Sequence, residues 1–159
     1  MKLTDILKLV ASIILCQLAG LIGSIFTTPA IPTWYESLKK PFYSPPNWIF
    51  GPVWVSLYLL MGISLFVIWQ RRENNLQAKK GLVLFFAQLI LNAFWSVAFF
   101  GLKSPFLGLI DIILLWFAIF FTIQHFFKIS KIAALLLLPY LLWVSFAVVL
   151  NFSLWILNM

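Results

Sequence analysis

The sequence has few charged residues, which make up 9% of its 159 positions, whereas hydrophobic residues make up 64%. A soluble domain carries about 25% charged residues. A soluble fold of this length has too little interior to bury so much apolar surface. The composition therefore excludes an ordinary soluble protein and predicts an integral membrane protein that forms one domain over residues 1–159.

Several residue patterns that carry chemistry are also missing. Cys16 is the single cysteine, so no intrachain disulfide can form, and its apolar surroundings are typical of a small hydrophobic side chain. His125 is the single histidine, and no His/Cys/Glu set has metal-binding spacing. The sequence contains neither a Ser-His-Asp arrangement nor a phosphate-binding glycine loop. We therefore predict neither a metal site nor a cofactor.

The net charge of +7 comes from basic residues clustered between apolar runs rather than along one face. This pattern is typical of orientation signals in membrane loops and does not favour a nucleic-acid partner. On alternate sides of a five-span chain, one side would hold eight basic residues: Lys2, Lys8, Arg71, Arg72, Lys79, Lys80, Lys128 and Lys131. The other side would hold Lys39, Lys40 and Lys103. We predict a cytoplasmic N-terminus and a bacterial inner membrane in preference to a mitochondrial outer membrane.

Five long apolar stretches predict membrane-spanning helices near residues 5–26, 47–70, 80–101, 105–127 and 131–156. In lipid each backbone polar group must be satisfied within its segment, which favours helices, and no ten-residue alternating strands support a barrel. The first run lacks a convincing cleavage site, so we interpret it as a retained span rather than a signal peptide. The expected fold is an all-α, five-transmembrane-helix bundle.

Local signals refine these helices. Ser104-Pro105 and Ser130 are typical helix starts, and Pro139 should kink the last helix. The first connection, residues 27–46, is long and rich in aromatic residues and proline. Long connections in compact domains are often functional. We expect this one to pack over the bundle as a lid.

Polar and small residues inside the spans have two interpretations each. A stripe of small residues at four-residue intervals in the first helix suits either packing within the bundle or a homodimer seam: Ser12, Cys16, Gly20 and Ser24. Asn92 and Trp95 share an inward face, which suits either helix contacts or a cavity wall. Asp111 is the one acidic residue inside a span and is expected to accept or donate a hydrogen bond with Asn92, Gln88 or a hydroxyl group.

Motifs along most of the chain resemble those of the TspO/translocator protein family, also called the peripheral-type benzodiazepine receptor or TspO/MBR family. The matching positions include Trp34-Tyr35, Lys40-Pro41, Pro45-Pro46, Trp48, Gly51-Pro52-Val53-Trp54, Leu57-Tyr58, Met61-Gly62, Leu91-Asn92, Trp95-Ser96, the segment 106–111, Pro139-Tyr140, Trp143, Phe146-Ala147 and Leu150-Asn151. The resemblance implies a pocket for porphyrins and other flat hydrophobic molecules beneath the first loop. Its implied residues are Tyr35, Pro45, Phe50, Trp54, Tyr58, Asn92, Trp95, Trp143 and Ala147.

The residues themselves support part of this pocket. Trp54 shares a helix face with Tyr58, and Trp143 shares one with the small Ala147, but helical phase does not show that the two faces meet. The expected function is porphyrin or tetrapyrrole binding in tetrapyrrole handling or stress regulation. The resemblance also implies two alternatives. One is light-dependent porphyrin degradation with Trp54 and Trp143 as catalytic residues, and the other is transport of tetrapyrroles or sterols. Phe152 stands where the family's animal members have the tyrosine of a sterol motif, which argues against sterol binding there.

Overall fold

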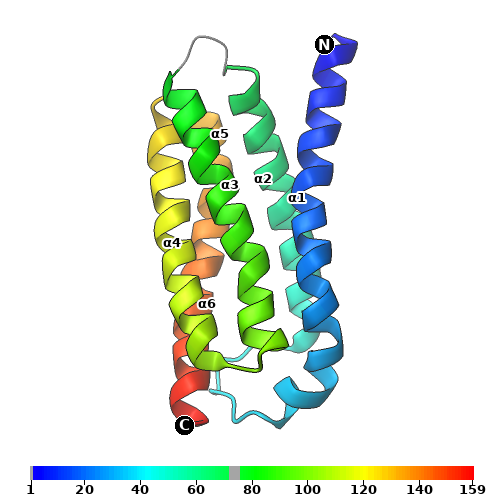
Figure 1. Cartoon of the computed structure of the whole chain (residues 1–159), viewed down its shortest axis with the longest axis vertical. Coiled ribbons are helices and arrows are strands. Elements are labelled where there is room, and N and C mark those ends of the chain that lie inside the picture. Colours follow the sequence, from blue (N-terminus) through cyan, green and yellow to red (C-terminus); the bar gives the residue numbers. More distant parts are fainter. Residues whose placement is uncertain (1, 72–75) are drawn as a thin grey trace.

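The computed structural model describes residues 2–71 and 76–159, and all regular secondary structure in these residues is helical (Figure 1). The elements are α1 (Leu3–Ala30), η1 (Ile31–Tyr35), η2 (Asn47–Ile49), α2 (Phe50–Trp69), α3 (Leu76–Ser96), η3 (Val97–Gly101), α4 (Pro105–Phe127), α5 (Lys131–Leu136) and α6 (Leu138–Leu157). Within the described part, five helical stretches are long and apolar enough to cross a membrane. The prediction of an all-α, five-span bundle is confirmed, and the chain is a multi-pass membrane protein.

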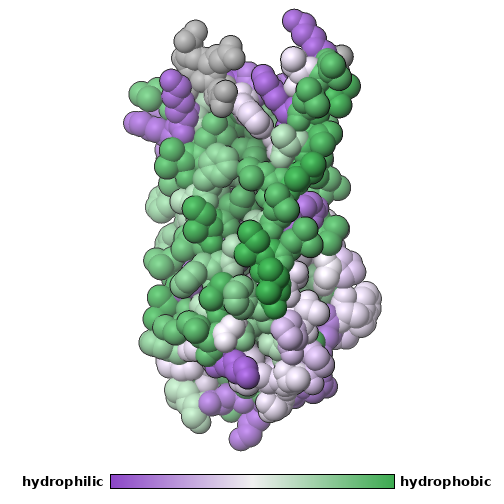
Figure 2. Space-filling model, turned by 45° about the vertical axis from the view of Figure 1, so that its right-hand side comes forward, coloured by the Kyte–Doolittle hydropathy of each residue, from purple (hydrophilic) through white to green (hydrophobic). Residues whose placement is uncertain are grey.

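The helices form a closed ring that combines neighbours in sequence with helices that are far apart in the chain. α1 packs against both α2 and α3, α3 packs against α4, α4 packs against α5 and α6, and α2 packs against α5. The N-terminus lies at one end of the bundle and the C-terminus at the other (Figure 1). Figure 2 shows an apolar band around the middle and hydrophilic residues gathered at the two ends, as a bilayer requires.

Close helix contact in the half of the bundle near the N-terminus depends on small residues. A Cβ atom on Gly62 of α2 would lie 2.6 Å from the Ile13 Cα atom of α1, so glycine is what lets these backbones approach. The Ser64 hydroxyl donates to the Ala133 carbonyl at 2.8 Å and joins α2 to α5. Large side chains such as Phe85 and Phe126 stack in the same tightly packed core.

The first helix is longer than the sequence predicted. Instead of ending near residue 26, α1 continues through Pro29 to Ala30, and the π-helical η1 extends it to Tyr35. Proline removes a backbone donor, but the Thr33 hydroxyl donates to the Pro29 carbonyl at 2.9 Å and the Ile31 N–H reaches the Thr27 carbonyl. These bonds help the helix continue past two prolines.

The connection between η1 and η2 packs across the end of the bundle. The Lys39 N–H donates to Asn158 Oδ1 at 2.9 Å, and Asn158 Nδ2 donates to the Lys39 carbonyl at 3.0 Å. The hydroxyls of Tyr43 and Ser153 are also hydrogen-bonded. The expected lid is therefore present over residues 36–46 rather than 27–46, and it is fastened to the C-terminal end of α6.

The helix starts and the kink that the sequence predicted for the later helices are confirmed. The hydroxyls of Ser104 and Ser130 accept hydrogen bonds from the N–H groups of Leu107 and Ala133 and cap α4 and α5. The last span divides into α5 and α6 at Leu137, two residues before Pro139, as the expected kink requires. Arg72, one of the predicted orientation signals, lies outside the described residues. The predicted sidedness in the membrane stays a prediction.

Candidate functional site

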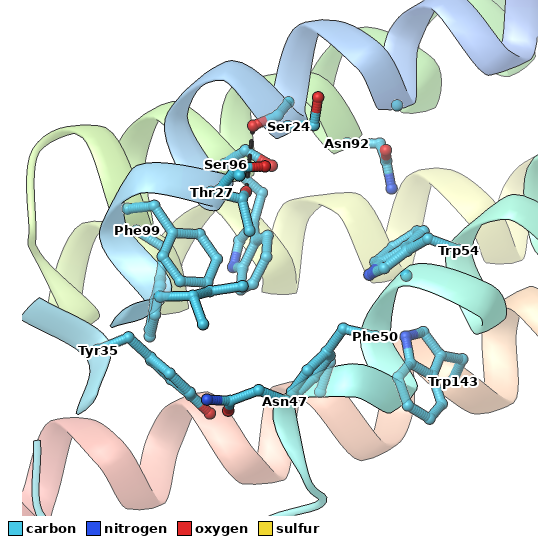
Figure 3. A pocket seen from close by; sticks show the side chains of 18 of the residues that line it. Ser24, Thr27, Tyr35, Asn47, Phe50, Trp54, Asn92, Ser96, Phe99 and Trp143 are labelled. Atoms are coloured by element: carbon cyan, nitrogen blue, oxygen red, sulfur yellow. Dashed lines mark hydrogen bonds between the residues drawn. The ribbon is translucent and has the colours of Figure 1, made fainter. Parts of the chain in front are cut away.

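A cavity of about 300 Å³ lies in the half of the bundle beneath the lid (Figure 3). Its walls come from α1, η1, η2, α2, α3, η3 and α6. Eight of the nine residues implied by the family resemblance line it: Tyr35, Phe50, Trp54, Tyr58, Asn92, Trp95, Trp143 and Ala147. Pro45, the ninth, sits in the connection above and is not among the lining residues. The structure thus brings together faces whose meeting helical phase did not predict.

Aromatic rings make a continuous belt around this cavity. Trp143 of α6 meets Phe50 of α2 edge-on, with ring centroids 6.1 Å apart, and Phe50 meets Tyr35 of η1 at 6.5 Å. Tyr35 then contacts Phe99 of η3 at 6.3 Å, and Phe99 stacks on Trp95 of α3 at 5.1 Å. Stacked and edge-to-face pairs are the favourable arrangements of aromatic rings. The belt therefore holds several ring faces at fixed positions around an empty space.

A hydrogen bond between α3 and α6 closes the belt. Trp95 Nε1 donates to Asn151 Oδ1 at 3.1 Å, and Asn151 Nδ2 donates to the Pro105 carbonyl at 2.7 Å. Asn151 is buried and is itself a lining residue. Its amide orients the Trp95 indole and links it to the start of α4.

The inner end of the cavity is closed by a buried polar network. The Tyr58 hydroxyl donates to Asn92 Oδ1, and Asn92 Nδ2 donates to the Tyr140 hydroxyl at 3.0 Å. All three residues are buried. Buried amides need such partners in an apolar medium. The inward position of Asn92 predicted from the sequence therefore serves both interpretations, since it joins helices and lines the cavity.

The two tryptophans that the resemblance singled out both border the cavity but stand in different surroundings. Trp54 stacks on Tyr58 with centroids 5.5 Å apart and meets Tyr140 edge-on at 6.1 Å. Trp143 contacts Phe50 and Phe146. In Figure 3 both indoles lie at the same end of the cavity, opposite Tyr35.

The sequence did not identify the contribution of α1 to the cavity. Gln17, Gly20, Ser24 and Thr27 all line it. Two of them belong to the small-residue stripe, whose other members, Ser12 and Cys16, are buried in the bundle. A side chain on Gly20 would collide with the Tyr58 ring. Packing within the bundle therefore accounts for most of the stripe. Polar residues recur every three or four positions around Gly20, and this pattern could have predicted that α1 forms a wall of the cavity.

The structure does not contain the hydrogen bond that was expected for Asp111. It is buried on α4, but it makes no hydrogen bond with any residue that the structure describes, and its Oδ2 atom is fully enclosed. The amide of Gln88 is likewise buried without a partner in the described part of the chain. Asn92, one of the expected partners of Asp111, is instead engaged by Tyr58 and Tyr140. The expected hydrogen bond was wrong: Tyr58 and Tyr140 engage Asn92, and Gln88, although unpaired among the described residues, does not bond to the carboxyl group.

The lining suits an apolar ligand with a few hydrogen-bonding groups. No residue that lines the cavity in the described part of the chain is Asp, Glu, Lys, Arg or His. The described residues also contain no group of three His, Cys, Asp or Glu side chains arranged to hold a metal. Apolar and aromatic walls with a few placed polar groups are characteristic of small-molecule sites.

The fold and the cavity define a class, a five-span helical membrane protein with an aromatic internal cavity, and comparison with known proteins narrows it to a family. The sequence profile of the TspO/MBR family matches residues 12–156. The tryptophan-rich protein TspO of Archaeoglobus fulgidus is 49% identical over 154 residues, which cover 97% of this chain and 99% of that protein.

Two less similar relatives also align with most of this chain. The protein CrtK of Rhodobacter capsulatus is 40% identical over 143 residues, covering 90% of this chain and 88% of that protein. The human translocator protein is 36% identical over 140 residues, covering 87% and 83%. The chain belongs to the TspO/MBR family.

Proposed function

We propose that this protein binds porphyrins and similar flat, hydrophobic tetrapyrroles in the aromatic cavity beneath the lid. The observation that carries the proposal is the belt formed by Trp143, Phe50, Tyr35, Phe99 and Trp95 around a space of about 300 Å³. Each well-placed ring contact is worth about 0.5–1.5 kcal/mol beyond the area that it buries. Several ring faces around one cavity favour a planar conjugated ligand over a flexible chain.

A second candidate function is light-dependent degradation of the bound porphyrin. The favouring observation is that Trp54 and Trp143, the two residues that the family resemblance assigns to this chemistry, both line the cavity. Both indoles would lie within reach of a ligand that fills it. Binding is the primary proposal because it needs only the shape and chemistry of the walls.

The test is a titration with protoporphyrin IX that follows tryptophan fluorescence, once in the dark and once under illumination. Saturable quenching in the dark supports binding, and loss of the porphyrin absorption band only in the light supports degradation. Ala147→Leu adds volume to the cavity wall and should weaken binding about tenfold, which corresponds to about 1.4 kcal/mol.

Val149→Leu is the matched control for this variant. Val149 is on the same helix, is exposed and is not a lining residue, so the control should bind like the parent. Unchanged affinity of a well-folded Ala147→Leu protein would place the porphyrin elsewhere and reject the proposed site.

A further inference from the structure

The cavity opens sideways rather than toward the lid. Five of its lining residues are exposed, and all five belong to α1 or α2: Leu21, Ser24, Thr28, Gly51 and Val55. The remaining lining residues are buried or half-buried. Leu21, Ser24 and Thr28 follow one another at three- and four-residue intervals, so they share a face of α1, and Gly51 and Val55 share a face of α2. We call these five residues the α1–α2 mouth.

The lid contributes nothing to this opening. Of the described residues 36–46, none lines the cavity. Two hydrogen bonds between Lys39 and Asn158 fasten the lid to α6, and the bond between Tyr43 and Ser153 adds a third attachment. The lid therefore acts as a fixed cover at the end of the bundle.

The mouth faces the bilayer. Leu21 and Val55 are 60% and 58% exposed, and exposed apolar residues such as Leu18 and Ile25 flank them on α1. Trp48, which is 73% exposed, stands where an interfacial aromatic anchor is expected. Val55 is seven residues further along the chain, or about 10 Å deeper at 1.5 Å per residue. The mouth thus extends from the headgroup boundary into the acyl region.

The edge of the α1–α2 mouth carries polar groups as well as apolar side chains. The Ser24 hydroxyl donates to the Leu21 carbonyl at 2.7 Å, which leaves its oxygen able to accept a hydrogen bond at the opening. At the inner edge Gln17 Nε2 donates to the Val55 carbonyl at 3.1 Å and joins α1 to α2. At Gly51 an added Cβ atom would meet nothing within 4 Å, so the opening is wide there.

From these observations we infer that ligands enter the cavity laterally from the membrane through the α1–α2 mouth, while the lid stays closed. The inference rests on the proposed function and specifies its ligand class. The occupant is a planar amphiphile already dissolved in the bilayer, with its ring system at the depth of Leu21 and Val55. An apolar rim at this depth gives such a molecule a path that never crosses water.

The test measures binding and release rates of protoporphyrin IX for the full chain in phosphatidylcholine vesicles, by tryptophan quenching. Leu21→Ala widens the mouth and should raise both the association rate and the dissociation rate by about threefold or more. Leu18→Ala removes an exposed leucine one turn away that does not line the cavity, and its rates should equal those of the parent.

Two further variants separate the mouth from the lid. Gly51→Phe should lower both rates about tenfold by narrowing the mouth. A disulfide between Lys39→Cys and Asn158→Cys locks the lid and should leave both rates unchanged. Slower binding in the locked protein, or parent-like rates in both Leu21→Ala and Gly51→Phe, would overturn lateral entry. Absence of saturable quenching in the parent would instead reject the proposed function itself, and lateral entry with it.

Discussion

The same five spans run through both halves of the bundle, yet one half is tightly packed and the other encloses a cavity. Near the N-terminal end, Gly62 lets α1 and α2 approach, and a Cβ atom on Gly81 would lie 3.1 Å from the Phe126 ring. Near the lid, Phe50 and Trp143 meet edge-on between α2 and α6, Trp95 stacks on Phe99, and all four rings line the cavity. Small residues allow helices to close, whereas a ring of large planar side chains props them apart. Glycines also allow close contact in the half near the lid, for example at Gly20, so the large planar rings are what distinguish that half.

The largest expected effect tests the packed half. Gly62→Ala should destabilise the protein by about 1–3 kcal/mol, because the new Cβ atom would force the Ile13 backbone away. Gly51→Ala in the hollow half is the matched control and should leave stability unchanged or slightly raised, since nothing lies within 4 Å and alanine is the better helix former. Thermal unfolding in one detergent compares the two variants, and equal melting temperatures would contradict the packing argument.

A second prediction concerns the buried polar groups that packing left without partners. Asp111→Leu should raise stability by about 1 kcal/mol, because it removes a buried carboxyl group that makes no hydrogen bond with the described residues. Asn92→Leu is the contrasting variant and should lower stability by about 1 kcal/mol, since it strands the hydroxyls of Tyr58 and Tyr140. Chemical unfolding in detergent would check both signs. A loss of stability in Asp111→Leu would show that the carboxyl group has a partner after all.

The smallest effect concerns Trp54 and Trp143, the two tryptophans on the α2 and α6 walls of the cavity. Trp54→Phe and Trp143→Phe keep an aromatic ring and should fold normally, but each should weaken protoporphyrin IX binding by about 0.5–1 kcal/mol through lost ring area. Trp48→Phe is the control, because Trp48 is exposed and does not line the cavity. The measurement is Kd from the dark titration, taken from porphyrin fluorescence so that removing an indole does not alter the signal. Equal Kd values for all three variants would place the ligand away from Trp54 and Trp143.

Much of the site could be predicted, and the failures have identifiable causes. Helical phase placed Tyr58 with Trp54 and Ala147 with Trp143, and the family resemblance predicted that these faces meet. Neither predicted the α1 wall, because Gln17, Ser24 and Thr27 are isolated polar residues in a long apolar run that looks like any other span. The hydrogen bond expected for Asp111 does not form, because residue types identify possible partners but do not show which side chains meet; Tyr58 and Tyr140 engage Asn92 instead.

Residue pattern was enough to predict the class of protein, the number of spans and several helix boundaries. Long uncharged segments must be helical in lipid, because the backbone there can satisfy its polar groups only within each segment, and Ser104, Ser130 and Pro139 act on their own neighbours. The tertiary structure alone decided how far α1 runs past its prolines, which helices meet around the cavity, and that its mouth lies between α1 and α2. Those features depend on contacts between residues far apart in the chain, and local preference carries no information about which distant face a side chain will meet.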